Sequence, residues 1–107
     1  MRMRDGPQWY RLEGHTPVLI GGLDELIAAG VANGTWAKVD HDYIGDVSIS
    51  TVFLGLDHNY WDEGPPILFE TMIFGGQHGD YQTRASTWDE AEKQHADALA
   101  LVKSGMN

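Results

Sequence analysis

The fold is decided by one stretch, Ile67-Leu68-Phe69-Glu70-Thr71-Met72-Ile73-Phe74, which Gly75-Gly76 closes. Its aromatic and β-branched residues favour an extended strand. Before it, residues 47–56 alternate between polar and apolar and then become a continuous apolar run, which is typical of a central strand covered on both faces at its C-terminal end. We therefore expect a long central hairpin in which residues 46–56 pair antiparallel with residues 67–75.

The flanking segments complete an α+β domain with an antiparallel sheet of about three to five strands. Pro17 lacks a donor for a sheet ladder, so we interpret residues 15–20 as an extended connector. Apolar residues from Leu23 onward recur at helical spacing and predict a short helix over residues 23–32. Further strands are predicted at residues 8–13, 36–42 and 80–85.

Residues 87–103 carry the clearest helix signal. The segment from Thr87 to Glu90 fits a capping box, in which the Thr87 hydroxyl reaches the backbone amide of Glu90, and Gly105 follows as a stop. We expect one face of this helix to lie on the sheet. That face is formed by Trp88, Ala91, His95, Ala98, Leu99 and Val102.

The composition indicates one folded, acidic domain, 1–107. Hydrophobic residues make up 42% and charged residues 21% of the 107 residues, which is close to the averages for globular proteins. Sixteen acids against seven bases give a formal charge of −9, which repels nucleic acid and attracts basic surfaces. The excess acid either keeps the protein soluble or makes it a mimic of DNA that binds a basic host protein.

The sequence also limits where the protein acts. The absence of cysteine excludes a disulfide, a thiolate nucleophile and a zinc-thiolate site. The basic N-terminus is followed by polar residues where an export signal needs an apolar run, and no apolar run approaches the roughly 20 residues that span a bilayer. We expect a cytoplasmic protein without membrane contact. Because a domain this small has modest stability, a homodimer is plausible.

Four segments follow one another in a recognisable order. They are Ile44-Gly45-Asp46-Val47, STVFLGLDH at residues 50–58, PPILFETMIFGG at residues 65–76, and Thr87-Trp88-Asp89-Glu90-Ala91-Glu92 with His95. In this order they resemble small uncharacterised proteins encoded by bacteriophages and prophages, and the resemblance covers roughly residues 44–102. It brings no known catalytic or binding residue and no cofactor with it.

The resemblance implies a phage or prophage origin and a compact fold, and no mechanism. Small phage proteins outside the capsid and replication machinery often act as accessory factors, and catalytic motifs are absent, so we expect a non-enzymatic protein that acts in counter-defence within an infected or lysogenic bacterium. Such a protein would bind a host protein or sequester a small nucleotide-type signal. For the second role, Arg11, Lys38 and Arg84 lie on or beside predicted strands, and with aromatic rings they would form a pocket for a phosphate and a base if they converge.

Glu70 and His95 are the candidates for acid-base chemistry. Strand alternation gives Glu70 apolar neighbours on both faces, so its carboxylate needs a partner, which is either an Arg or backbone amide, or a ligand. His95 stands on the apolar face of the last helix and would point at the sheet that carries Glu70. It is either a satisfied core histidine or, with Glu70, the centre of a small acid-base enzyme.

The long loop between the hairpin strands supplies further candidates. Asp57 and His58 open it, and Tyr60 and Trp61 place two rings in it. Exposed rings there would stack on a base or anchor a partner, whereas Trp61 would otherwise fold back over the core.

A metal site is not expected. Asp40 and Asp42 face one way along a strand and His41 the other, so this tripeptide is poorly arranged to supply three ligands. Residues 75–79 are rich in glycine but lack the Lys-Ser or Lys-Thr pair of a phosphate loop, and neither a zinc-protease motif nor a nucleophile elbow occurs. We therefore expect a binding protein without a cofactor rather than an enzyme.

Overall fold

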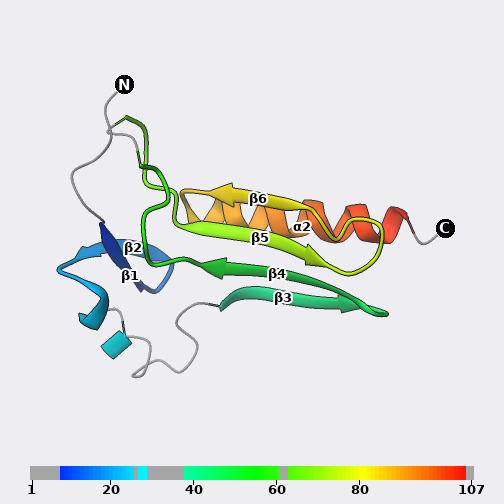
Figure 1. The fold of residues 1–107 in the computed structure, drawn as a ribbon, viewed down its shortest axis with the longest axis horizontal. Helices are drawn as coiled ribbons and strands as arrows, with labels where there is room; N and C mark the ends of the chain where they lie inside the picture. Colours follow the sequence, from blue (N-terminus) through cyan, green and yellow to red (C-terminus); the bar gives the residue numbers. More distant parts are fainter. Residues whose placement is uncertain (1–7, 26, 29–37, 61–62, 106–107) are drawn as a thin grey trace.

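A computed structural model describes residues 8–25, 27–28, 38–60 and 63–105 of the chain (Figure 1). These residues form two antiparallel sheets and a long C-terminal helix, which confirms the predicted α+β class. The elements are β1 (Trp9–Glu13), β2 (Thr16–Ile20), β3 (Lys38–Ile44), β4 (Val47–Phe53), β5 (Phe69–Phe74), β6 (Gln82–Ala85) and α2 (Trp88–Ser104).

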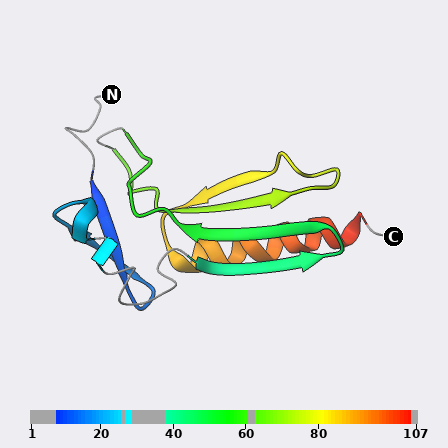
Figure 2. The same ribbon diagram turned by 60° about the horizontal axis from the view of Figure 1, so that its bottom comes forward.

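The larger sheet has the strand order β3-β4-β5-β6, and α2 lies across one of its faces (Figures 1 and 2). Its centre is the predicted hairpin, because β4 and β5 pair antiparallel from Phe53 opposite Phe69 to Ser48 opposite Phe74. The side chains at Ile49, Thr51 and Phe53 alternate with partly exposed neighbours and are buried beneath the helix. The opposite face of the sheet is not covered by α2.

Strand β4 ends at Phe53, three residues before the predicted Leu56. The regular ladder with β5 ends there because the chain also pairs with β1, although the N–H of Leu54 still donates to the Leu68 carbonyl at 2.7 Å. The N–H of Tyr10 donates to the Gly55 carbonyl at 2.7 Å, and Leu56 forms a bridge opposite Trp9. The apolar run after Phe53 therefore joins the two sheets.

The interpretation of residues 15–20 as a connector was wrong. Residues 16–20 form β2, which pairs with β1 across a turn at Gly14, where φ is +60°. Both strands of a two-stranded sheet are edge strands, so Pro17 lies opposite Leu12 without interrupting a third strand. This hairpin lies at the end of the large sheet where α2 begins (Figure 1). The His15 ring stacks on Trp88 with 3.9 Å between centroids.

Helix α2 begins and packs as predicted. The Thr87 hydroxyl accepts the N–H of Glu90 at 3.2 Å and donates to its carboxylate, which satisfies a backbone donor that the helix itself leaves unpaired. Four residues of the predicted face are buried against the sheet: Ala91, His95, Ala98 and Val102.

The other predicted elements are seen in part. Residues 23–25 and 27–28 are helical, whereas residues 26 and 29–32 of the predicted short helix lie outside the described residues. The strand predicted at 36–42 runs from Lys38 to Ile44, and residues 36–37 also lie outside the description. Among the described residues, no helix has the length and apolar character that a bilayer crossing requires.

The core consists of two apolar clusters. One contains Phe53, Leu68, Phe69, Ala85 and Ala91, and lies at the end where the β1–β2 hairpin packs. The other contains Ile49, Ile73, Ala98 and Val102, and lies toward the C-terminus of α2. Three buried polar residues lie between the two clusters. They are Thr51 on β4, Thr71 on β5 and His95 on α2.

Candidate metal centre

The three polar residues in the middle of the core form a chain of hydrogen bonds. Thr51 lies opposite Thr71 in the β4–β5 register, and their hydroxyl oxygens are 2.7 Å apart. The Nδ1 atom of His95 is 2.7 Å from the Thr51 hydroxyl, and the histidine is only 2% exposed. Each group therefore has a partner in a region that water does not reach. We call these residues the polar layer.

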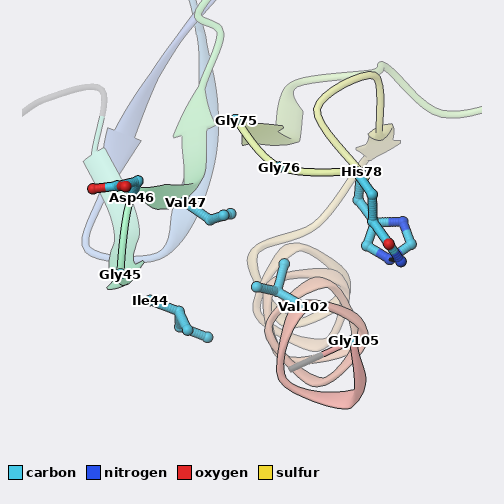
Figure 3. A pocket seen from close by; sticks show the side chains of 10 residues that line it. Ile44, Gly45, Asp46, Val47, Gly75, Gly76, His78, Val102 and Gly105 are labelled. Carbon is cyan, nitrogen blue, oxygen red and sulfur yellow. Dashed lines mark hydrogen bonds between the residues drawn. The ribbon is translucent and has the colours of Figure 1, made fainter. Parts of the chain in front are cut away.

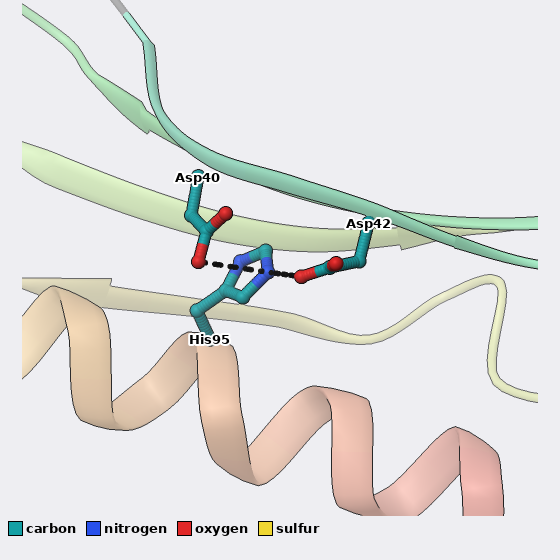
Figure 4. A group of neighbouring side chains, drawn as sticks. All are labelled: Asp40, Asp42 and His95. Atoms are coloured by element: carbon teal, nitrogen blue, oxygen red, sulfur yellow. Dashed lines mark hydrogen bonds and ion pairs between the residues drawn. The ribbon is translucent and has the colours of Figure 1, made fainter.

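The second ring nitrogen of His95 points toward β3, at the edge of the sheet (Figure 4). Its Nε2 atom is 2.8 Å from a carboxylate oxygen of Asp42 and 3.6 Å from one of Asp40. The two carboxylates are about half exposed, at 43% and 53%. We call Asp40, Asp42 and His95 the Asp–His cluster. In it, a buried imidazole contacts two carboxylates that reach the solvent.

The register of β3 places both carboxylates under the helix. Asp40 lies opposite Thr51 and Asp42 opposite Ile49, which are both residues of the helix-covered face. A register shift between Lys38 and Asp40 precedes them. The prediction that Asp40 and Asp42 share one side and His41 takes the other is confirmed, because His41 lies on the opposite face and hydrogen-bonds Ser48 there.

The polar layer fixes how His95 is oriented, and a neutral imidazole there has two possible arrangements of its proton. In one, Nε2–H donates to Asp42, and Nδ1 accepts the Thr51 hydroxyl, which in turn accepts that of Thr71. In the other, Nδ1–H donates to Thr51, and the Nε2 lone pair faces the two carboxylates. The second arrangement is the one that a metal-ligating histidine adopts, with its other N–H held by a neighbouring acceptor.

The order Asp42, His95, Thr51 is that of a nucleophilic triad, but the geometry excludes that chemistry. The Thr51 side chain is completely buried between β5 and α2. An acyl or phosphoryl group would have to reach its Oγ1 atom, and no surface leads there. Thr51 therefore serves to hold His95.

The Asp–His cluster has the composition and dimensions of a divalent metal site. Its three ligand atoms all lie within 4.8 Å of one another. Zn²⁺ and similar ions bind histidine nitrogen and carboxylate oxygen at about 2.0–2.2 Å, so ligands around one ion lie roughly 3–3.6 Å apart. The contacts of 2.8 and 3.6 Å in the cluster are close to this spacing. The third separation, between the two carboxylate oxygens, is at most 4.8 Å, so a bound ion would draw the two half-exposed carboxylates toward each other.

Glu70, predicted as a possible partner of His95, lies on the other face of the sheet. Its carboxylate accepts hydrogen bonds from Gln82 and, at 3.1 Å, from Arg84 on β6. The neighbouring residue Thr71 is the one that points toward His95. The hypothesis that Glu70 and His95 form an acid-base pair is therefore wrong in its geometry, and Glu70 instead pairs with an arginine.

The three cations proposed to hold a phosphate do not converge. Lys38 lies on β3 and Arg84 on β6, which are opposite edges of the sheet. Arg11 lies on the separate β1–β2 hairpin and pairs with Glu13. A nucleotide pocket built from these side chains is not present.

The loop residues stabilise the loop itself. Asp57 is buried, and one of its carboxylate oxygens accepts the backbone N–H groups of Asn59 and Ile67, each at 2.8 Å. His58 contacts the Leu56 carbonyl through Nδ1 at 2.7 Å. Tyr60 is exposed, while Trp61 lies outside the described residues. Asp57 thus closes the loop by holding both of its ends.

A separate pocket of about 500 Å³ lies at the other end of the sheet, where the β3–β4 and β5–β6 turns meet the end of α2 (Figure 3). Aliphatic side chains of Ile44, Val47 and Val102 line it, and its polar groups come from Asp46, Gln77 and His78. No Lys or Arg is among its lining residues, so it offers no charged partner to a phosphate.

Comparisons with known proteins bring no further assignment: no protein family, curated protein or solved structure matches the chain. The candidate site therefore depends on its own geometry.

The sequence contained both halves of the Asp–His cluster. The pattern of β3 put the two carboxylates on one side, and the pattern of α2 put His95 on the buried face. The missing information was that the helix crosses beside β3, because Asp42 and His95 are 53 residues apart in the chain. Knowledge of where α2 crosses the sheet would also have predicted that His95 contacts the threonines of β4 and β5.

Proposed function

We propose that this chain is a non-enzymatic binding protein that holds one divalent metal ion between Asp40, Asp42 and His95. One observation carries the proposal: two carboxylates from β3 and one buried imidazole from α2 converge within 4.8 Å. Two carboxylates would balance the two positive charges of the ion. The nitrogen and oxygen donors, without sulfur, suit ions such as Zn²⁺, Mn²⁺ or Fe²⁺.

The polar layer supports this proposal independently of the carboxylates. Burying hydroxyl and imidazole groups costs free energy that aliphatic side chains at the same positions would not cost. Thr51 and Thr71 lie between apolar residues on both sides along their strands, so the fold itself does not need them. Their arrangement would orient a ligating histidine, as second-sphere groups do in metal sites.

Three protein ligands would leave coordination positions open on the solvent side, where Asp40 and Asp42 are half exposed. Such positions accept an oxygen atom from a partner, such as a phosphate or carboxylate group. Direct coordination of that oxygen would hold the partner without the cluster of cations that Arg11, Lys38 and Arg84 do not form. We therefore place the metal site in the counter-defence role expected from the phage resemblance, as the point where a signal molecule or host protein is held.

The two alternative functions receive less support. The acid-base enzyme lacks its pair, since Glu70 and His95 lie on opposite faces of the sheet. The acidic mimic requires acids gathered on one surface. Instead the described acids are spread from β1 through the edge strand β3 and the hairpin turns to α2.

The test is metal titration of protein first stripped with a chelator. We expect Zn²⁺ or Mn²⁺ to bind at one ion per chain by calorimetry, and Co²⁺ to give visible absorption bands. Asp42→Asn should weaken binding at least tenfold, because it removes a charged ligand. Asp46→Asn is the matched control, since Asp46 is an exposed acid in the turn after β3 and outside the cluster. Equal affinities of the two variants, or no binding by the unmodified chain, would refute the proposal.

A further inference from the structure

The face of the large sheet that α2 leaves uncovered is an unusual surface for an acidic protein. Its side chains are those that alternate with the buried residues of β3 to β6. They are Lys38, His41, Tyr43, Ser48, Ser50, Val52, Glu70, Met72, Phe74, Gln82 and Arg84, and we call this surface the open face. Figure 2 shows α2 on one side of this sheet, and the register of β3 and β4 puts the open face on the other side, opposite the Asp–His cluster.

Two aromatic side chains of the open face are exposed to solvent. Tyr43 is 73% exposed and Phe74 is 49% exposed, and both lie in the cross-strand row that contains Ser48. The Tyr43 ring is stacked on His41 with 4.7 Å between centroids, which holds it in place. Exposed aromatic side chains such as these are enriched at the centres of protein interfaces, as is Met, which the open face also carries at Met72.

The charge of the open face indicates which partner it fits. It carries one acid, Glu70, against two bases, Lys38 and Arg84, although the whole chain has a formal charge of −9. Glu70 is already paired with Arg84. The outer surface of α2, in contrast, carries four acids and two bases, which are Asp89, Glu90, Glu92, Asp97, Lys93 and Lys103.

We infer that two copies of this chain associate through their open faces. Like-charged molecules repel unless they meet where the local charge is small, and the open face is such a surface. We expect the partner to be a second copy of this chain for two reasons. In a two-fold interface both copies use the same surface, so both sides would be poor in acid, and each copy would cover the exposed rings of the other. The inference goes beyond the proposed metal binding and does not depend on it.

The area of the open face indicates which class of interface two copies would form. The four strands have seven, seven, six and four residues, and at about 3.4 Å per residue and about 4.8 Å between strands they give a flat area of roughly 390 Å². With the relief of the side chains, two copies would bury on the order of 1,000 Å², near the lower limit for a specific interface. We therefore expect a dimer that dissociates on dilution.

The experiment is sedimentation equilibrium over a wide range of concentration. The unmodified chain should shift from the 11.9 kDa of one copy toward twice that mass as concentration rises. Tyr43→Asp should weaken the association at least tenfold, and Phe74→Lys, on the neighbouring end of the same face, should do the same. Tyr60→Asp is the matched control, because Tyr60 is an exposed tyrosine in the long loop. Circular dichroism confirms that each variant remains folded.

A second measurement locates the interface. The chain has no cysteine, so Ser50→Cys places a single thiol at the middle of the open face. A bis-maleimide that spans about 10 Å, the spacing of stacked sheets, should join two copies of this variant but not of Ser104→Cys on the outer end of α2. A monomer at every concentration, or a dimer that Tyr43→Asp and Phe74→Lys leave intact, would overturn the inference. Chelators should not change the mass.

Discussion

Replacing Thr51 by valine tests the polar layer directly. Valine keeps the shape of threonine but removes the hydroxyl that links Thr71 to His95. Both partners are buried, so water cannot replace the lost contacts. We therefore expect Thr51→Val to destabilise the fold although it adds a methyl group to the core.

The magnitude follows from the two contacts of 2.7 Å that disappear. A buried polar group that loses its partner costs about 1–3 kcal/mol, so two such groups cost roughly 2–4 kcal/mol if one of them finds a partial substitute. A loss of about 2 kcal/mol lowers Tm by about 10 °C in a domain near this size. Urea unfolding, followed by tryptophan fluorescence, measures the change in the free energy of unfolding.

Two further variants make the result decisive. Thr83→Val is the matched control, because the Thr83 hydroxyl is buried next to Thr71 without a hydrogen-bond partner among the described residues, and its removal should be neutral or stabilising. The triple variant Thr51→Val, Thr71→Val, His95→Leu removes all the partners together and should recover most of the lost stability. Two results would show that the polar layer is not held by these hydrogen bonds. One is a loss of less than about 0.5 kcal/mol in the free energy of unfolding of Thr51→Val, and the other is a loss in the triple variant equal to the sum of the losses in the three single variants.

Three other substitutions test individual contacts of the fold outside the Asp–His cluster. Thr87→Ala removes the N-cap of α2 and should cost about 1 kcal/mol in urea unfolding. Asp57→Ala leaves two backbone N–H groups of the long loop without their acceptor, so we expect about 2–4 kcal/mol of destabilisation and faster proteolysis within the loop. Gly76→Ala should be destabilising by about 1–2 kcal/mol, as measured by Tm, because φ is +68° there and the added Cβ would lie 2.9 Å from Val47. A wild-type unfolding curve for any of them would contradict the corresponding contact.

Much of the fold follows from patterns in the sequence because local periodicity decided it. The β4–β5 hairpin and the buried face of α2 each depend on residues close together in the chain, and both were predicted. The strand β2 was missed because Pro17 was weighed as a residue of a central sheet, whereas it lies in an isolated two-stranded hairpin. The end of β4 was misplaced because an apolar run gives no sign of which sheet it joins.

The candidate site was less predictable because it depends on tertiary placement. Strand alternation shows which residues share a face but not which face the helix covers. From the sequence alone, either Glu70 or Thr71 was therefore able to lie on the face that His95 contacts. In the structure Thr71 lies on the helix-covered face, and Thr51 links its hydroxyl to His95. Likewise, nothing local in the sequence indicates that α2 crosses close enough to β3 for Asp40 and Asp42 to reach the imidazole.

The position of the two carboxylates on β3 has a consequence for solubility. Among the described residues, no strand pairs with the outer side of β3, so its backbone donors and acceptors form a template for the addition of a foreign strand. Charged groups turned inward from an edge strand discourage such growth, because an added strand would bury them. A bound cation would neutralise Asp40 and Asp42, so the ion that fastens α2 to β3 would also weaken this protection against fibril formation.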